Sequence, residues 1–338
     1  MQNTSHINRP GWYQLPNRIF LNKFLGITAF ALFTLLLISP SKAHSSNMMI
    51  ESCPDGMVGD GSQGDPCQIT DRAQLEAMAD GLNLHYELMD NIDLSDDEWT
   101  PIGDSTNPFT GSFDGNSHTI ANLTIDRPST DYVGLFGQTN DAVISNLKLF
   151  DIDVNGQKRV GGLIGYAKDT SISQISSSGS VTSTIDSGDS QVGGIVGYLI
   201  DKSSITHSYS SVNVKGSADE VGGLLGYLRN GSLENVYATG TVDGDNRVGG
   251  LVGGVLVNGG GTIDKSYAIG EVQGSGSDVG GLIGGLFGTG TNNLDITSSY
   301  WDTQSTGQAT STGGTGLTTT QMYVSSNFTD AGWDFEGV

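Results

Sequence analysis

The stretch VGGLLG at residues 221–226 decides the fold of this chain, because close copies of it stand at five other places. The copies are VGLFG at 133, VGGLIG at 160, VGGIVG at 192, VGGLVG at 248 and VGGLIG at 279. Successive copies begin 27 to 32 residues apart. A block that recurs every 20 to 50 residues is typical of a solenoid, a propeller or another stacked array.

The segments between the copies repeat as well. After residues 221–226 the chain has a polar turn, then SLENVYATG, then TVDG and a loop, and the next unit matches closely. Apolar residues and tyrosines recur at equivalent places in successive units. The three sets are Ile172, Ile205, Leu233 and Ile263; Val181, Val214, Val242 and Val272; and Tyr209, Tyr237, Tyr267 and Tyr300.

A unit of about 30 residues that is made of short β runs cannot bury its own apolar side. Stacking the units as coils gives each strand two neighbours about 4.8 Å away and aligns equivalent residues in columns. We therefore predict an all-β fold, a right-handed parallel β-helix, in which the rings of the tyrosine set are neighbours. A β-propeller is the alternative, although a propeller blade usually needs about 40 residues and four strands.

Both sides of the VGGLLG strand carry apolar residues. In strict alternation Val221 and Leu225 face one side and Leu224 faces the other. Either the double glycine bends the strand so that all three side chains turn inward, or another element covers the second face.

The composition excludes several partners. Acidic residues outnumber Lys and Arg by 37 to 15, so nucleic acid and anionic membranes would meet a surface of like charge. The 50 glycines are too many for an ordinary helical enzyme, and they follow no strict Gly-X-Y period.

The N-terminus resembles a secretory signal. Basic residues precede an apolar run at 24–39, and the small-residue pattern Ser41-Lys42-Ala43 follows. We expect residues 1–43 to be removed after Ala43, and no membrane insertion afterwards. A membrane anchor is the alternative, but the run is shorter than the ~20 residues that span a bilayer. The remaining chain would carry 37 acidic and 11 basic residues, a net charge of −26.

The rest of the chain divides into three segments by its pattern. Residues 44–130 lack the repeat and form an N-terminal cap segment, with a short helix after Thr70 or Asp71. Residues 131–303 hold the repeats, and residues 304–338 form a C-terminal cap or tail. Cys53 and Cys67 are an even, local pair in an exported protein, which predicts a disulfide.

These residues resemble a known family. The VGGLxG block followed by an SYAxGxV-type strand is similar to the GLUG repeat, named for its Gly-Leu-any-Gly core, over roughly 131–303. The segments GDGSQGDPCQI, WTPIG and FTGSFDGNSHTIANLTI look like the lead-in to such repeats. The resemblance implies a bacterial secreted or cell-surface protein, adhesin-like or an accessory region of an immunoglobulin A peptidase.

A search for catalytic motifs finds none. The chain has no HExxH for a zinc peptidase, no GxSxG nucleophile elbow and no phosphate loop ending in GK[ST]. Asp151 and Asp153 point the same way on a strand and could act on a glycosidic bond, but no Arg or Lys cluster accompanies them. His207 falls at a repeat position that Asn235 and Lys265 also occupy, which indicates an exposed strand residue.

One loop could bind a hard cation. Asp55, Asp60 and Asp65 lie in a Gly-rich stretch and could supply oxygen ligands to calcium, although their spacing does not match DxDxDG. No other cofactor is expected.

Tyr166, Tyr198 and Tyr227 follow successive blocks directly and form the candidate contact surface. If they are exposed and stacked, they would bind sugar rings or a protein partner. If they are buried, they fill a corner of the coil. The sequence favours a non-catalytic binding or adhesion protein whose partner is an extracellular glycan or a host or matrix surface protein. The alternative is a polysaccharide-active lyase or hydrolase on a β-helix, by fold analogy.

Overall fold

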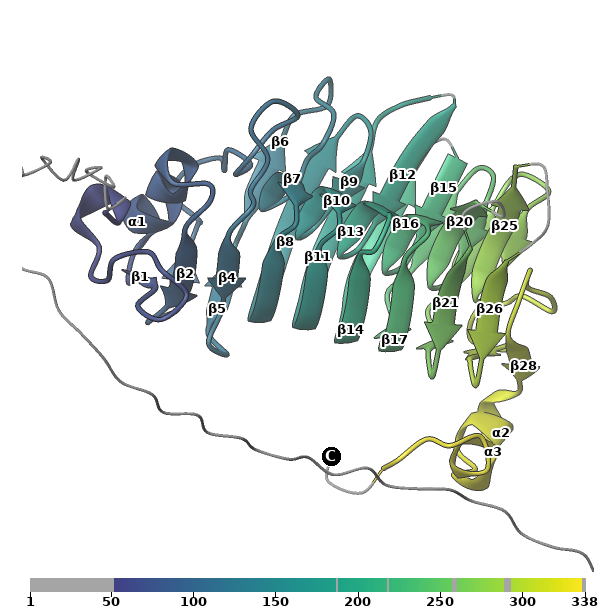
Figure 1. The fold of residues 1–338 in the computed structure, drawn as a ribbon. Helices are drawn as coiled ribbons and strands as arrows, with labels where there is room; N and C mark the ends of the chain where they lie inside the picture. The colour runs from purple at the N-terminus through teal and green to yellow at the C-terminus, as the bar shows by residue number, and fades with distance from the viewer. Residues whose placement is uncertain (1–51, 187, 218, 257–259, 289–292, 336–338) are drawn as a thin grey trace, which may run out of the picture. The chain divides into compact units, whose positions relative to one another are not determined.

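The computed structural model describes residues 52–186, 188–217, 219–256, 260–288 and 293–335. They form a β-solenoid in which every pairing between named strands is parallel (Figure 1). Three sheets run along its axis. The predicted parallel β-helix is therefore confirmed, and a propeller is ruled out because the sheets continue from coil to coil.

Five successive coils contribute to all three sheets. The five-stranded sheet contains β9 (Val160–Gly161), β12 (Asp189–Gly193), β15 (Asp219–Gly222), β19 (Val248–Gly249) and β24 (Val279–Gly280). The six-stranded sheet contains β7 (Phe136–Asn140), β10 (Ile164–Lys168), β13 (Val196–Ile200), β16 (Leu225–Arg229), β20 (Val252–Leu256) and β25 (Ile283–Phe287).

The third sheet has 17 strands and includes the N-terminal cap segment. Its strands are β1 (Cys67–Ile69), β2 (His85–Leu88), β3 (Ile92–Asp93), β4 (Ser112–Asp114), β5 (Thr119–Ala121), β6 (Thr124–Asp126), β8 (Val143–Gly156), β11 (Ser171–Ser183), β14 (Ser204–Gly216), β17 (Ser232–Ala238), β18 (Val242–Gly244), β21 (Gly261–Asp264), β22 (Tyr267–Ala268), β23 (Val272–Gly274), β26 (Leu294–Thr297), β27 (Tyr300–Asp302) and β28 (Thr315–Leu317). Because β4, β5 and β6 all pair with β8, this sheet runs without a break across residue 130.

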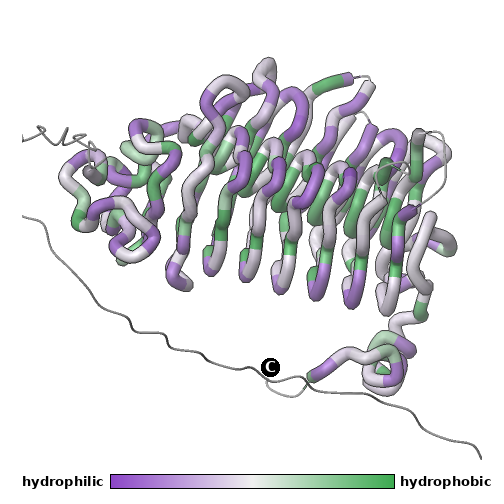
Figure 2. Tube along the Cα trace, viewed as in Figure 1, coloured by the Kyte–Doolittle hydropathy of each residue, from purple (hydrophilic) through white to green (hydrophobic). Residues whose placement is uncertain are grey.

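The predicted columns are present. Ile205 pairs in register with Ile172 and Leu233, and Val214 pairs with Val181 and Val242. All of these side chains are buried, and Figure 2 shows apolar positions recurring at the same place from coil to coil. The core is therefore a set of continuous apolar columns, as expected for stacked repeats.

The double glycine produces a bend between two sheets. β15 ends at Gly222 and β16 begins at Leu225, while Val221, Leu224 and Leu225 are all fully buried. A Cβ at Gly222 would lie 2.1 Å from the carbonyl oxygen of Leu225, so the bend has no room for a side chain. Of the two arrangements open from sequence, the chain adopts the bent one.

Left-handed residues recur at two further places in successive coils. Asp141, Asp169, Asp201 and Asn230 have positive φ where the chain passes from the six-stranded to the 17-stranded sheet. Asn146, Gln174, His207, Asn235 and Lys265 have positive φ within that larger sheet. Asn and Asp tolerate this backbone region best among non-glycine residues. His207 is exposed, as its repeat position indicated.

The short helices lie in the two terminal segments. They are η1 (Pro54–Gly56), α1 (Arg72–Ala77), η2 (Met78–Asp80), α2 (Thr319–Met322) and α3 (Ser326–Thr329). The carboxylate of Asp71 accepts a hydrogen bond from the backbone N–H of Gln74, so Asp71 is the N-cap of α1. Leu75 and Met78 face the core.

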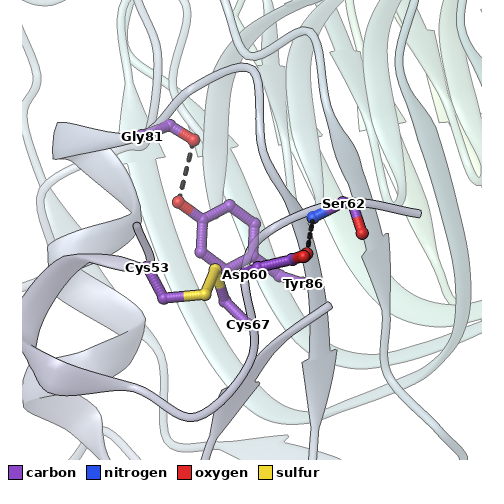
Figure 3. Close-up of a disulfide and its surroundings, with 6 residues drawn as sticks. All are labelled: Cys53, Asp60, Ser62, Cys67, Gly81 and Tyr86. Carbon is purple, nitrogen blue, oxygen red and sulfur yellow. Dashed lines mark hydrogen bonds between the residues drawn. A yellow bond between two sulfur atoms is a disulfide. The ribbon is translucent and has the colours of Figure 1, made fainter. Parts of the chain in front are cut away.

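A disulfide joins Cys53 to Cys67, as predicted (Figure 3). Cys67 opens β1, where it pairs with Tyr86, and the Tyr86 hydroxyl donates a 2.8 Å hydrogen bond to the carbonyl of Gly81. The disulfide therefore links the segment around Cys53 to β1, the first strand of the solenoid.

Removing this disulfide should destabilise the N-terminal cap segment. Closing a loop of about 15 residues contributes ~3 kcal/mol in the chain-entropy model. We expect the double variant Cys53→Ala, Cys67→Ala to unfold at a lower temperature than the wild type, and dithiothreitol to lower the wild-type transition to match. The variant itself should not respond to dithiothreitol. Two free thiols in exported protein, seen by mass spectrometry, would contradict the pairing.

The predicted signal segment, residues 1–43, and its cleavage site lie outside the described residues. In the part of the chain that the structure describes, no helix is long and apolar enough to cross a membrane.

Candidate functional site

The three candidate tyrosines form a continuous column on the six-stranded sheet. Tyr166, Tyr198 and Tyr227 stand on β10, β13 and β16 and pair in register. The ring centroids of Tyr166 and Tyr198 are 5.3 Å apart, and those of Tyr198 and Tyr227 are 4.5 Å apart, both edge to face. Such edge-to-face pairs add stability beyond the area that they bury. We call this set the tyrosine column.

The column lies at the margin between surface and core. Tyr166 and Tyr198 are partly exposed, whereas Tyr227 is only 6% exposed. Burial raises the pKa of all three phenols above the ordinary value. The rings of Tyr166 and Tyr198 can therefore contact a ligand, whereas Tyr227 mainly packs between its neighbours.

Other aromatic residues extend the column at both ends. Tyr132 packs edge-on against Tyr166 at 5.9 Å, and Phe287 packs against Tyr227 at 4.9 Å. Phe287 reaches this place because Gly254, which is in register with Tyr227, has no side chain; a Cβ there would lie 3.1 Å from the Phe287 ring. The aromatic surface is thus longer than the tyrosine pattern alone indicates.

Arg159 inserts a cation into this surface. Its guanidinium lies 4.9 Å from the ring centre of Tyr132 and 5.5 Å from that of Tyr198. It donates a 2.6 Å hydrogen bond to the Tyr132 hydroxyl, while its buried Nε–H has no partner among the described residues. Arg159 therefore places a positive charge between two aromatic rings, and its Nε–H is available to donate a hydrogen bond.

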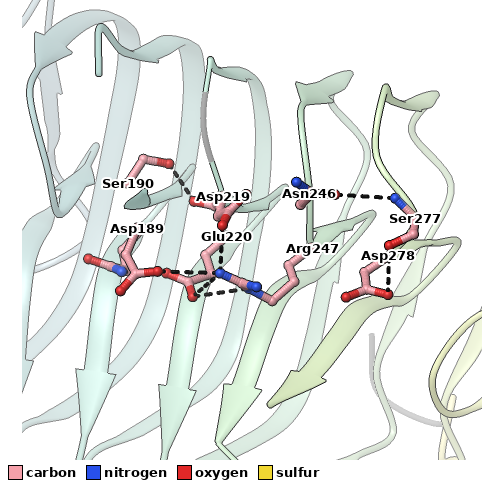
Figure 4. Close-up of polar contacts among 9 residues, drawn as sticks. Asp189, Ser190, Asp219, Glu220, Asn246, Arg247, Ser277 and Asp278 are labelled. Carbon is pink, nitrogen blue, oxygen red and sulfur yellow. Dashed lines mark hydrogen bonds and ion pairs between the residues drawn. The ribbon is translucent and has the colours of Figure 1, made fainter. Parts of the chain in front are cut away.

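A polar cluster, shown in Figure 4, adjoins the column at Phe287, because the Arg247 guanidinium lies 5.0 Å from the centre of that ring. The Nε of Arg247 is 3.1 Å from Glu220, and its Nη2 is 2.8 Å from Asp219 and 3.3 Å from Asp189. The Gln191 amide donates a hydrogen bond to the second oxygen of Glu220. One arginine on one coil thus holds carboxylates from the two preceding coils.

The Glu220 carboxyl is fully enclosed. Its side chain is 0% exposed, and burial raises its pKa to about 7 despite the opposing effects of Gln191 and Arg247; the charge of Asp189 raises it further. Desolvation therefore outweighs the ion pair. Because the side chain is fully buried, this carboxyl does not contact a ligand, and its ionised form lowers the stability of the coil.

The residues that flank the column share one position in the sequence repeat. Tyr132, Arg159, Gln191, Glu220 and Arg247 each stand directly before the valine of a VGG-type block, and each has positive φ. The position varies in residue type while the block stays constant, so it can carry specificity without disturbing the stack.

A second aromatic stack lies on the 17-stranded sheet. The rings of Tyr209, Tyr237 and Tyr267 are successively 4.8 Å apart and nearly parallel, with interplanar angles of 1° and 5°. The predicted stacking is confirmed for these three rings and is wrong for Tyr300, the fourth member of the set. Tyr300 is in register with Tyr267, but its ring packs edge-on against Phe328 at 5.0 Å instead.

The remaining candidates do not converge on a site. Asp55, Asp60 and Asp65 are all exposed, and among the described residues no three His, Cys, Asp or Glu side chains gather as a metal site would require. Asp151 and Asp153 are exposed on β8, where Asp151 has positive φ and Asp153 accepts a 2.7 Å hydrogen bond from Ser180.

The sequence matches the family profile described as the GLUG motif at residues 188–215 and 217–243. The chain carries GLUG repeats. The in-register pairing of Val133, Val160, Val192, Val221, Val248 and Val279 extends the same structural repeat to both sides of the matched region. The resemblance inferred from the VGGLxG blocks is therefore confirmed.

Two relatives share the GLUG-repeat chain's sequence over most of its length. Halomucin of Haloquadratum walsbyi is 35% identical over 272 residues, which cover 76% of this chain and 3% of halomucin. A protein of Evansella cellulosilytica, provisionally named Gly-rich membrane protein, is 29% identical over 391 residues, covering 83% of this chain and 44% of that protein. The chain thus spans less than half the length of either relative.

Two solved structures share the fold of the GLUG repeats. A protein from Bacteroides ovatus, provisionally named immunoglobulin A1 protease, has a TM-score of 0.64 at 22% identity, covering 78% of this chain and 87% of that one. A second, named IgA1 protease, has a TM-score of 0.51 at 20% identity, covering 69% of this chain and 19% of that one. At these identities the likeness is one of architecture.

Proposed function

We propose that this chain is a secreted or cell-surface binding protein that recognises an extracellular glycan without changing it chemically. The observation that carries the proposal is the aromatic surface formed by Tyr132, Tyr166 and Tyr198 around Arg159. Tyrosine rings supply flat apolar faces and arginine supplies directed hydrogen-bond donors, which suits binding to sugar rings.

Three features support export. The N-terminus has the pattern of a secretory signal, and the two cysteines of the chain are paired, as is usual in oxidising compartments. One relative is named halomucin, and another is provisionally named as a membrane protein.

Two features support binding without catalysis. The sequence holds none of the nucleophile or zinc motifs that were sought. The carboxyl with a pKa near 7, Glu220, is enclosed and paired with Arg247, so a substrate has no path to it. Glycan turnover that is abolished by Asp151→Asn or Asp153→Asn would contradict this part of the proposal.

Truncating the tyrosine column should weaken binding more than it weakens the fold. On an array of extracellular glycans and matrix proteins, we expect the variants Tyr166→Ala and Arg159→Ala to lose about tenfold in affinity for the captured glycan. Tyr209→Ala is the matched control, because Tyr209 is also stacked and 37% exposed but lies on another sheet. The proposal fails if all three variants bind alike, or if only proteins are captured.

A further inference from the structure

A hollow of about 600 Å³ lies where the C-terminal segment packs against the solenoid. Its apolar walls come from several elements: Tyr267 on β22, Tyr323 after α2, Phe328 on α3, and Trp333 and Phe335 beyond α3. A concave, mostly aromatic site of this size with a few polar groups is typical of a small-ligand pocket.

Four of the five aromatic rings that line the hollow, those of Tyr267, Phe328, Trp333 and Phe335, form one connected cluster. Trp333 lies 6.1 Å from Tyr267, 5.4 Å from Phe328 and 6.1 Å from Phe335, and its indole N–H donates a 2.9 Å hydrogen bond to the carbonyl of Ser298. Tyr323 is 87% exposed and Phe335 is 49% exposed. Trp333 is thus held in place, while two aromatic side chains at the hollow remain open to an incoming group.

One wall of the hollow carries a buried carboxylate. Asp302, on β27, is 3% exposed and lines the hollow. Its Oδ1 accepts three hydrogen bonds, from the backbone N–H groups of Gln304 and Ser305 and from the Thr319 hydroxyl. None of the hydrogen bonds described for Asp302 goes to Oδ2, so that oxygen can accept a ligand's donor while Oδ1 keeps the side chain fixed.

The surroundings favour a positive charge. From residue 266 to the end of the sequence there are seven Asp and Glu residues and no Lys, Arg or His. No cation of this segment itself can therefore pair with Asp302, and the local potential attracts a cation from outside.

We propose that this hollow binds an alkylammonium cation over its aromatic rings, paired with the Asp302 carboxylate. Aromatic faces attract such cations through the ring quadrupole, and they do so more strongly where water is excluded. The group could arrive as a free quaternary ammonium compound such as choline, or as a lysine side chain of a partner protein. This site is independent of the tyrosine column, which lies on another sheet.

The decisive experiment compares probes of the same shape that differ in charge. Tryptophan fluorescence and titration calorimetry on the full chain would be recorded with choline and with its neutral isostere 3,3-dimethylbutan-1-ol. The same measurement would compare N-acetyl-lysine methylamide with its norleucine analogue. We expect the preferred cation to bind at least about tenfold more tightly than its neutral counterpart. The choline and lysine arms distinguish the two sources.

Two variants locate the site. Asp302→Asn keeps an oxygen for the three donors but removes the charge, and we expect about tenfold weaker binding of the cation; Asp295→Asn, an exposed position on β26, is the matched control. Tyr323→Ala should also weaken binding with little effect on folding, because that side chain is largely exposed. Equal binding of the neutral isosteres, binding of neutral oligosaccharides alone, or no response to either cation would overturn the proposal.

Discussion

Replacing Gly222 with alanine should cost about 4 kcal/mol or more of unfolding free energy, and could prevent folding of the central coils. The added Cβ would lie 2.1 Å from the Leu225 carbonyl oxygen and 2.6 Å from the Gly253 nitrogen. Both are backbone atoms of the bend and of the next coil, so neither can move aside without breaking the stack. Overpacking against immobile backbone belongs to the few mechanisms that give such large effects.

Gly64→Ala is the matched control for that measurement. A Cβ at Gly64 meets nothing within 4 Å, and its backbone is not in the left-handed region. We expect its melting temperature, followed by circular dichroism, to stay close to the wild type or to rise slightly, because alanine restricts the unfolded chain. If the two variants Gly222→Ala and Gly64→Ala have the same melting temperature, the close packing described for the bend between β15 and β16 is wrong.

Replacing Glu220 with glutamine should stabilise the protein at pH 8 and leave it unchanged near pH 4. The pKa of Glu220 rises from its ordinary 4.5 to about 7 on folding, so the folded state favours the protonated carboxyl. The stability that protonated Glu220 contributes is fully present below pH 4.5 and is lost as the pH rises through about 7. The shift corresponds to about 3 kcal/mol at pH 8.

Urea unfolding at several pH values would test this prediction. The difference in unfolding free energy between Glu220→Gln and the wild type should be near zero at pH 4, grow across the interval from 4.5 to 7, and level off at about 3 kcal/mol. Glu234→Gln, an exposed glutamate on β17, is the control and should show a small difference at every pH. A Glu220→Gln variant less stable than the wild type at pH 8 would mean that the Arg247 ion pair outweighs desolvation.

The contacts that the sequence predicted correctly are those between equivalent residues of stacked coils. In a parallel, in-register solenoid, equivalent residues of successive coils are neighbours, so the tyrosine column and the stack of Tyr209, Tyr237 and Tyr267 could be predicted from spacing alone. The pairing of Cys53 with Cys67 followed from local chemistry. Nothing in the described residues bears on removal of residues 1–43, which stays a prediction.

The sequence by itself determined the coil, its register and the columns of its core, because stacked copies of one unit place equivalent residues next to each other. Only the tertiary structure decided which way side chains turn at the double glycine, how Phe287 fills the space left by Gly254, and how Arg247 reaches Asp189 on an earlier coil. It also formed the C-terminal hollow from Tyr267, Trp333 and Asp302. These contacts join residues at non-equivalent positions of the repeat, so the repeat spacing does not predict them.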